Sequence, residues 1–213
     1  LELNGCSGNI ISLLNGQNTD FEYTFASMIN IILYSNSFMV AEDEKASHIS
    51  HILAVGACAT HGGVSAAKPN PSESVGINKV LTNKKIIMLP GCPVHPDWFL
   101  GTLAHLLLYG EPDTDNLNRP LMFYSTLIHD RCPRRPFFDR GIFAEKLSDK
   151  TCLFKLGCRG PVTRTDCPTR QWNGHINWPI GANTPCIGCS QFGFPDAMAP
   201  FISYDTTRVV KNE

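Results

Sequence analysis

Nine cysteines in a chain of 213 residues constrain this sequence more than any other feature. Six of them lie in the later part of the chain, together with one well-spaced histidine: His129, Cys132, Cys152, Cys158, Cys167, Cys186 and Cys189. The other three, Cys6, Cys58 and Cys92, are single and widely spaced. An odd number leaves one thiol over in a pure disulfide framework, and a chain of this length buries a sizeable core without disulfides. Metal ligation is therefore the better interpretation.

The residues beside the cysteines favour the same interpretation. Glycine and proline flank Cys92, Cys158 and the pair Cys186 and Cys189. Glycine lets the backbone approach a bulky inorganic group closely, and proline fixes the local turn. Loops of this kind also direct backbone N–H groups at the sulfurs of a cluster, which tunes its reduction potential.

The spacing of the cysteines separates zinc from iron–sulfur clusters. Zinc sites usually combine two short Cys-x2-Cys pairs, whereas this chain has one, Cys186 and Cys189. Iron–sulfur clusters accept ligands from separate loops, and histidine can replace a cysteine. The donors then form a four-ligand set, a three-ligand set that suits a three-iron cluster, and a second three-ligand set: His129, Cys132, Cys152 and Cys158; Cys167, Cys186 and Cys189; and Cys6, Cys58 and Cys92.

Composition describes a soluble globular protein, with 43% apolar residues, 17% charged residues and a formal net charge of −1. This balance argues against nucleic acid or an anionic membrane surface as the main partner. The sequence has no apolar run of 18 or more residues and no visible signal peptide or twin-arginine stretch. It begins at Leu1 without a methionine, so a processed N-terminus would hide either signal. We expect a periplasmic or membrane-associated protein if an export signal has been removed, and a cytoplasmic one otherwise.

The order of apolar segments predicts the fold class. Residues 1–9 indicate the end of a strand and a glycine loop, and residues 28–41 indicate one or two buried strands. Parallel-type strands are predicted at 52–55 and 85–89, each running into a loop with a cysteine, and an amphipathic helix at 96–109 ends before Gly110. This repetition predicts an α/β fold with a doubly wound parallel sheet. Because ligands collect at the carboxyl ends of such strands, Cys6, Cys58 and Cys92 are expected to converge.

From about Glu111 the composition changes: prolines and aromatic residues become frequent, and the periodic spacing of apolar residues is lost. We therefore predict two domains, at residues 1–112 and 113–213, the second small, irregular and organised by its metal groups.

Nine sequence blocks resemble the small subunit of nickel–iron hydrogenases of the uptake type, over most of the chain. They lie at residues 54–63, 67–71, 90–93, 96–99, 128–132, 152–161, 167–169, 178–181 and 185–189. The resemblance implies a flavodoxin-like first domain that binds a proximal cluster. It also implies a medial [3Fe-4S] cluster on Cys167, Cys186 and Cys189, with Pro179 in the place of a fourth ligand. The distal [4Fe-4S] cluster is implied on His129, Cys132, Cys152 and Cys158.

The same resemblance implies a heterodimeric hydrogenase, an H2:acceptor oxidoreductase whose nickel–iron centre lies on a large subunit. This chain is then expected to transfer electrons to an external acceptor, such as a cytochrome, a quinone-linked protein or a soluble carrier, and to have no catalytic residue of its own. The alternative is a hydrogen-sensing regulatory complex of the same architecture. A cluster subunit of a respiratory complex shares the first domain, but it is expected to lack the six-cysteine second one.

Two departures from the family pattern concern the N-terminal region. Asn9 stands where the family commonly has the second cysteine of a Cys-x-x-Cys pair. The proximal cluster is then [3Fe-4S], or it is [4Fe-4S] with a non-thiolate ligand such as Asn9 or Glu42. The loss of one negative thiolate is expected to raise the cluster potential and to favour hydrogen oxidation. The region between Asn18 and His48 is also short, either because the protein is compact or because segments are absent from the sequence.

The remaining polar residues near the cysteines have more ordinary interpretations. His61 is expected to be structural. Five further histidines are expected to be surface or helix-packing residues: His48, His51, His95, His105 and His175. Five arginines accompany the distal set and form either a solvated face or a rim that docks an acidic electron partner: Arg131, Arg134, Arg135, Arg159 and Arg164.

Overall fold

The computed structural model describes residues 51–196 of the chain. The predicted elements before residue 50, with Cys6, Asn9 and Glu42, lie outside the described residues. Within the described part, no helix is both long enough and apolar enough to cross a membrane.

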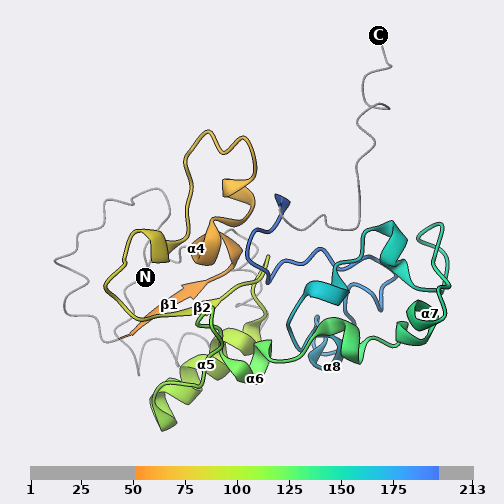
Figure 1. Ribbon diagram of the computed structural model, residues 1–213. Helices are drawn as coiled ribbons and strands as arrows, with labels where there is room; N and C mark the ends of the chain where they lie inside the picture. Colours follow the sequence, from red (N-terminus) through yellow and green to blue (C-terminus); the bar gives the residue numbers. More distant parts are fainter. Residues whose placement is uncertain (1–50, 197–213) are drawn as a thin grey trace.

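A parallel pair of strands organises the first part of the structure (Figure 1). Strand β1 (Ile52–Val55) pairs with strand β2 (Ile86–Leu89) in the register Ile52 to Ile86 and Val55 to Leu89. All four residues of β2 are buried, as expected for an apolar strand of a parallel sheet. Both predicted strands and the α/β class are thereby confirmed.

Helix α5 (Pro96–Tyr109) follows the loop after β2 and has the predicted bounds. His95 caps it by accepting a hydrogen bond from the backbone N–H of Asp97, and proline occupies the first turn, where its missing N–H costs nothing. Gly110 ends the helix with φ 82°. Trp98 and Phe99 are buried, so this face of the helix packs into the core.

The segment after β1 differs from the predicted loop. Cys58 lies in a short helix, α4 (Ala57–His61), which Gly62 ends in a left-handed conformation. The hydroxyl of Thr60 donates to the carbonyls of Gly56 and Ala57 and so stabilises the turn. A five-residue helix is too short for a periodic apolar pattern, so it could not be predicted from the sequence. Short 3-10 helices follow at Gly63–Ala66 and Ile77–Lys79.

The later part of the described chain consists of short helices joined by loops. Its α-helices are α6 (Leu121–Tyr124), α7 (Arg135–Asp139) and α8 (Cys167–Arg170), and its 3-10 helices are Ile128–Arg131, Leu153–Leu156 and Gly160–Val162. After β2, the described residues form isolated β-bridges but no further strand. These short helices and loops agree with the irregular structure predicted for the second half of the chain.

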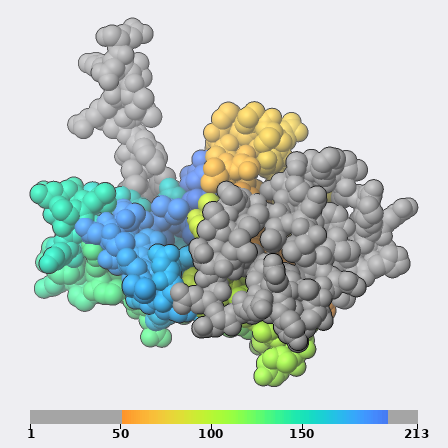
Figure 2. Space-filling model, turned by 180° about the vertical axis from the view of Figure 1, so that it is seen from behind, coloured from red at the N-terminus to blue at the C-terminus, as the bar shows by residue number. Residues whose placement is uncertain are grey.

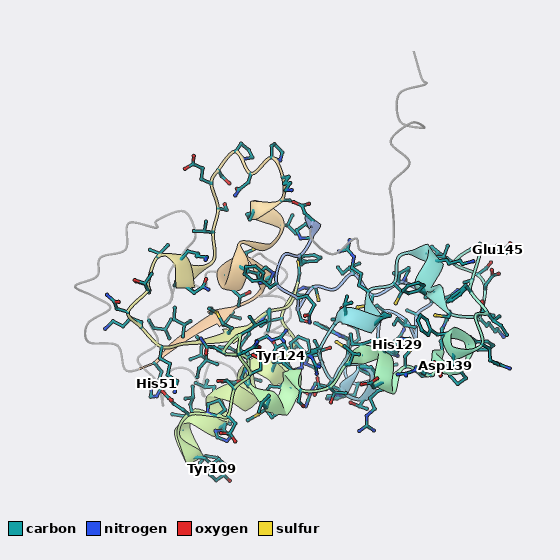
Figure 3. The ribbon with its side chains drawn as sticks, viewed as in Figure 1. His51, Tyr109, Tyr124, His129, Asp139 and Glu145 are labelled. Atoms are coloured by element: carbon teal, nitrogen blue, oxygen red, sulfur yellow. The ribbon has the colours of Figure 1, made fainter. Side chains whose placement is uncertain are left out.

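One apolar core crosses the predicted domain boundary at residue 112. It contains Leu89 and Trp98 from the first part and Leu153 and Trp178 from the second. Tyr124, at the junction of the two parts in Figure 3, is fully buried and donates its hydroxyl to the carbonyl of Pro90 over 2.9 Å. Burial raises the pKa of Tyr124 well above its ordinary value. The boundary itself stays a prediction.

The end of the described chain returns to the first part. Phe194 packs against Ala57 at the start of α4, and the backbone N–H of Lys68 donates to Asp196 over 2.6 Å. Seen from behind, the blue residues extend from the later part towards the orange segment that includes α4 (Figure 2). The two parts are therefore linked at both ends of the second one.

The backbone of Gly63 packs closely against the backbone of Cys58, and a substitution at Gly63 tests this contact. A Cβ at Gly63 would lie 2.8 Å from the backbone nitrogen of Cys58, whereas one at Gly141 would meet nothing within 4 Å. Both glycines have positive φ, 51° and 69°. We expect Gly141→Ala to cost about 1–2 kcal/mol from the backbone alone, and Gly63→Ala to cost about 1–3 kcal/mol more from overpacking. Thermal unfolding of both variants measures the difference, and equal costs would contradict the close approach.

Candidate metal centres

The first candidate centre is a pocket lined by all four donors of the predicted distal set. His129 lies in the 3-10 helix Ile128–Arg131, and Cys132 ends that helix. Cys152 begins the 3-10 helix Leu153–Leu156, and Cys158 follows its left-handed end at Gly157. The four donors therefore come from two short turns 20 or more residues apart and line one pocket: His129, Cys132, Cys152 and Cys158.

His129 has the properties of a metal ligand. Its Nε2 atom is buried and has no hydrogen-bond partner among the described residues. Burial, followed by the positive charge of Arg135, lowers the pKa of His129, so the imidazole is neutral at physiological pH. The ring of Phe138 packs edge-on against it at 4.4 Å, and Figure 3 shows His129 inside the later part of the molecule, with Asp139 of α7 beyond it. A neutral, oriented imidazole with a free nitrogen fits a metal.

The three thiols beside His129 are neutral without a metal. Burial raises the pKa of Cys132, Cys152 and Cys158, and the nearby Arg134 guanidinium opposes part of that rise. Arg134 donates hydrogen bonds to the carbonyls of Asp149 and Thr151, at 3.2 and 2.9 Å, and to Oδ1 of Asn183 at 2.7 Å. It thus holds the loop before Cys152 and places a cation near the thiols.

The second candidate centre gathers the predicted medial set. Cys167 is the first residue of α8, and Cys186 and Cys189 lie on the loop that returns to the first part. Burial raises the pKa of Cys186 to about 12, and burial together with the thiols of Cys167 and Cys186 raises that of Cys189. The indole Nε1–H of Trp172 donates to Sγ of Cys167 at 3.4 Å. The thiol of Cys167 thus acts on the pKa of both Cys186 and Cys189.

Pro179 lies between the buried side chains of Trp178 and Ile180 and is itself exposed. Its carbonyl accepts a hydrogen bond from the N–H of Thr184 at 2.8 Å, which closes the turn before Cys186. Its place beside the medial cluster stays a prediction.

The third set is described in part. Cys58 and Cys92 follow β1 and β2, and the backbone N–H of Ala57 donates to the carbonyl of Gly91 over 2.7 Å. The two cysteines therefore lie at the same edge of the sheet, as predicted from parallel strands. Cys6 and Asn9 are outside the described residues, so the completion of this set and the roles of Asn9 and Glu42 stay predictions.

The donor sets fit clusters better than single ions. Among residues 51–196, no three His, Cys, Asp or Glu side chains are arranged to hold one metal ion, and all eight cysteines are free thiols. A cluster differs because each ligand bonds its own iron, so the ligands stand farther apart. Buried neutral thiols would become thiolates only beside a strong positive charge, which iron supplies.

The five arginines expected to form either a solvated face or a docking rim are mostly engaged with the protein itself. Arg164 donates to the carbonyl of Ser125 at 2.7 Å, and Arg159 donates to the carbonyls of Ile187 and Pro195. Arg135 pairs with Asp130 and Asp139. With Arg134 bound to the loop before Cys152, these contacts favour a structural role over an open basic face for four of the five.

His61 is the polar residue whose surroundings the sequence least predicted. Its Nδ1 contacts the hydroxyl of Thr60 at 2.8 Å, and its Nε2 is buried without a hydrogen-bond partner in the described part of the chain. Burial, with the charge of Arg119, lowers the pKa of His61 to about 4. The ring lines a cavity of about 140 Å³. His95 is buried and packs on Trp172, as expected for a packing histidine.

Two protein-family models match the chain. Residues 124–202 match the C-terminal region of the NiFe/NiFeSe hydrogenase small subunit, and residues 41–106 match the 20 kDa subunit of NADH ubiquinone oxidoreductase. The second match covers the segment with Cys58 and Cys92, and the first covers all donors of the other two sets.

Individual relatives agree with the family match. The chain is 47% identical over 164 residues to an uptake hydrogenase small subunit of Bradyrhizobium diazoefficiens, covering 74% of this chain and 44% of that protein. It is 44% identical over 163 residues to a periplasmic [NiFe] hydrogenase small subunit of Solidesulfovibrio fructosivorans, covering 74% and 51%. A solved [NiFeSe] hydrogenase from Desulfovibrio vulgaris Hildenborough is 27% identical, with a TM-score of 0.81 and 96% of each chain covered.

The fold and the sets of cysteines together define an iron–sulfur protein with a parallel α/β sheet and an irregular, cysteine-rich second half. The chain belongs to the family of nickel–iron hydrogenase small subunits. It spans about half the length of the curated relatives that it matches.

Proposed function

We propose that this chain is the electron-transfer small subunit of a heterodimeric nickel–iron hydrogenase. Its partner is the large subunit, which holds the nickel–iron centre, and electrons from hydrogen oxidation leave through this chain to an external acceptor. The observation that carries the proposal is the pocket of His129 and three cysteines, in which a buried imidazole nitrogen lacks a hydrogen-bond partner among the described residues. The family match covers the same residues.

Three iron–sulfur clusters would supply one-electron redox chemistry when bound. His129, Cys132, Cys152 and Cys158 hold the distal [4Fe-4S] cluster, and Cys167, Cys186 and Cys189 hold the medial [3Fe-4S] cluster. Cys6, Cys58 and Cys92 hold the proximal cluster, with Asn9 or another oxygen or nitrogen donor for a fourth iron. The protein contributes by burying four of these cysteines, which excludes water, and by directing N–H groups at the thiols: Cys152, Cys158, Cys167 and Cys186.

The order of the three sets supports a linear relay. The backbone of Cys92 donates a hydrogen bond towards Cys189, which joins the proximal set to the medial one. The backbone of Cys186 does the same towards Cys158 and joins the medial set to the distal one. The N–H of Arg159 also donates to the carbonyl of Cys186 at 2.8 Å. Neighbouring clusters held this closely would pass electrons along the chain of cysteines.

The compartment belongs to the proposal as well. The Solidesulfovibrio relative is named as periplasmic, which supports an exported protein.

The test is iron and sulfide analysis with low-temperature EPR of the oxidised heterodimer. We expect one three-iron signal from the medial site and iron for two four-iron clusters, if a non-cysteine ligand completes the proximal one. Two three-iron signals would mean that Asn9 leaves the proximal site open. Absence of clusters from a folded, intact heterodimer would overturn the proposed function.

A further inference from the structure

Trp172 directs the one polar atom of its side chain at a candidate cluster thiol. Its Nε1–H donates to Sγ of Cys167 at 3.4 Å, a normal length for a hydrogen bond to sulfur. Cys167 is buried, and this hydrogen bond lowers the pKa of its thiol against the larger rise caused by burial. The contact therefore acts on the ligand of the medial set that the sequence places farthest from the other two.

The indole of Trp172 is fixed by groups from the first part of the chain. His95, which caps α5, packs against it with ring centroids 4.7 Å apart, and Trp98 packs edge-on at 5.9 Å. Nε2 of His95 and the carbonyl of Gln171, the residue before Trp172, lie 2.6 Å apart. On the other side, the N–H of Asn177 donates to the carbonyl of Trp172. The donor is thus oriented before a cluster binds.

The neighbouring carboxylate of Asp166 is satisfied by other donors. Trp98 donates its Nε1–H to Asp166 at 2.8 Å, and Arg170 donates its Nε–H to the same carboxylate at 2.8 Å. Asp166 therefore does not compete for the indole of Trp172. The indole N–H of Trp172 donates its hydrogen bond to the sulfur of Cys167.

We propose that Trp172 sets the reduction potential of the medial cluster through its hydrogen bond to Cys167. Reduction adds one electron to the cluster and raises the negative charge on its sulfurs. A donor directed at a ligand sulfur stabilises that charge and raises the potential. Trp172 is a positioning residue that acts through Cys167, and the inference rests on the proposed function, in which Cys167 ligates this cluster.

The test is Trp172→Phe in the holo heterodimer, which keeps an aromatic ring and removes the N–H. The three-iron EPR signal is titrated against applied potential. At the wild-type midpoint potential, the ratio of reduced to oxidised medial cluster is expected to fall about three- to tenfold. A tenfold fall corresponds to about 59 mV for a one-electron couple. The distal cluster in the same sample serves as the control, and its potential should not move.

A second measurement detects the N–H itself. In D2O, the unmodified complex should show coupling of an exchangeable deuteron to the three-iron cluster by electron–nuclear double resonance, and Trp172→Phe should lose that coupling. An unchanged potential together with an unchanged coupling would overturn the inference while leaving the proposed function intact. Equal shifts at both clusters would reduce Trp172 to a general packing role. Absence of a medial three-iron cluster from the wild type would instead count against the proposed function.

Discussion

Replacing His129 with leucine is expected to eliminate the distal four-iron cluster, through loss either of the iron that His129 binds or of the whole cluster. Leucine fills a similar volume but has no nitrogen, so the pocket keeps only three thiols: Cys132, Cys152 and Cys158. Loss of an outer-shell partner alone costs metal sites about 10–100-fold in affinity or activity, so loss of a direct ligand is expected to cost at least as much. Iron analysis should lose one to four irons per heterodimer, and dye reduction with hydrogen should fall by at least about tenfold.

His105→Leu is the matched control for this change. His105 lies near the end of α5, where its Nδ1 contacts the carbonyl of Gly110 at 2.9 Å, far in sequence from any donor set. The same substitution there should leave iron content and dye reduction unchanged. A His129→Leu heterodimer with full iron content and wild-type EPR would show that His129 is not a ligand.

The regular elements were predictable because their signals are local. Strand β2 is a continuous buried apolar run, and α5 begins at a proline and ends before a glycine. The helix that carries Cys58 was missed because five residues form barely more than one turn. Its stability comes from the Thr60 hydroxyl and from glycines with positive φ on either side, which a periodic pattern does not reveal.

The two pairs of the distal set were predictable from their spacing, because His129 and Cys132 lie three residues apart and Cys152 and Cys158 flank one short 3-10 helix. The long-range contacts of the residues around the donors were not predictable. Arg134 reaches Asn183, 49 residues away, and Trp172 is packed by His95 from α5. Such contacts join segments distant in sequence, so only the folded chain brings them together. The hydrogen bond from Trp172 to Cys167 spans only five residues, and this nearness in sequence was the one signal available for it.

The medial set contacts both the proximal and the distal set, an arrangement that the order of the cysteines in the sequence does not predict. The backbone of Cys92 donates a hydrogen bond towards the thiol of Cys189, and the backbone of Cys186 donates one towards the thiol of Cys158, so the loop with Cys186 and Cys189 bridges the two parts of the molecule. Cys186 and Cys189, three residues apart in the medial set, therefore contact different sets: Cys186 contacts the distal set, and Cys189 contacts the proximal set. A compact loop can therefore hold one cluster and face two others.

Replacing Arg134 with glutamine is expected to destabilise the distal cluster and to lower its potential. The change removes the bonds that tie Arg134 to the carbonyls of Asp149 and Thr151, so the loop before Cys152 loses its anchor. It also removes the cation that partly offsets the raised pKa values of the three cysteine thiols. Without that cation, an added electron is less favoured. Retention of the distal cluster against a chelator should fall about 10–100-fold, the range for loss of an outer-shell partner.

Two further variants separate the charge of Arg134 from its hydrogen bonds. Arg134→Lys keeps the charge but cannot reproduce the planar fork that reaches three oxygens, so the potential should recover while chelator resistance stays low. Arg131→Gln removes the same charge from an exposed neighbour and should leave both quantities close to wild type. EPR-monitored titration and chelator-release kinetics of the four heterodimers make the comparison. If Arg131→Gln matches Arg134→Gln in both measurements, net charge alone is responsible, and the anchoring of the Cys152 loop contributes nothing.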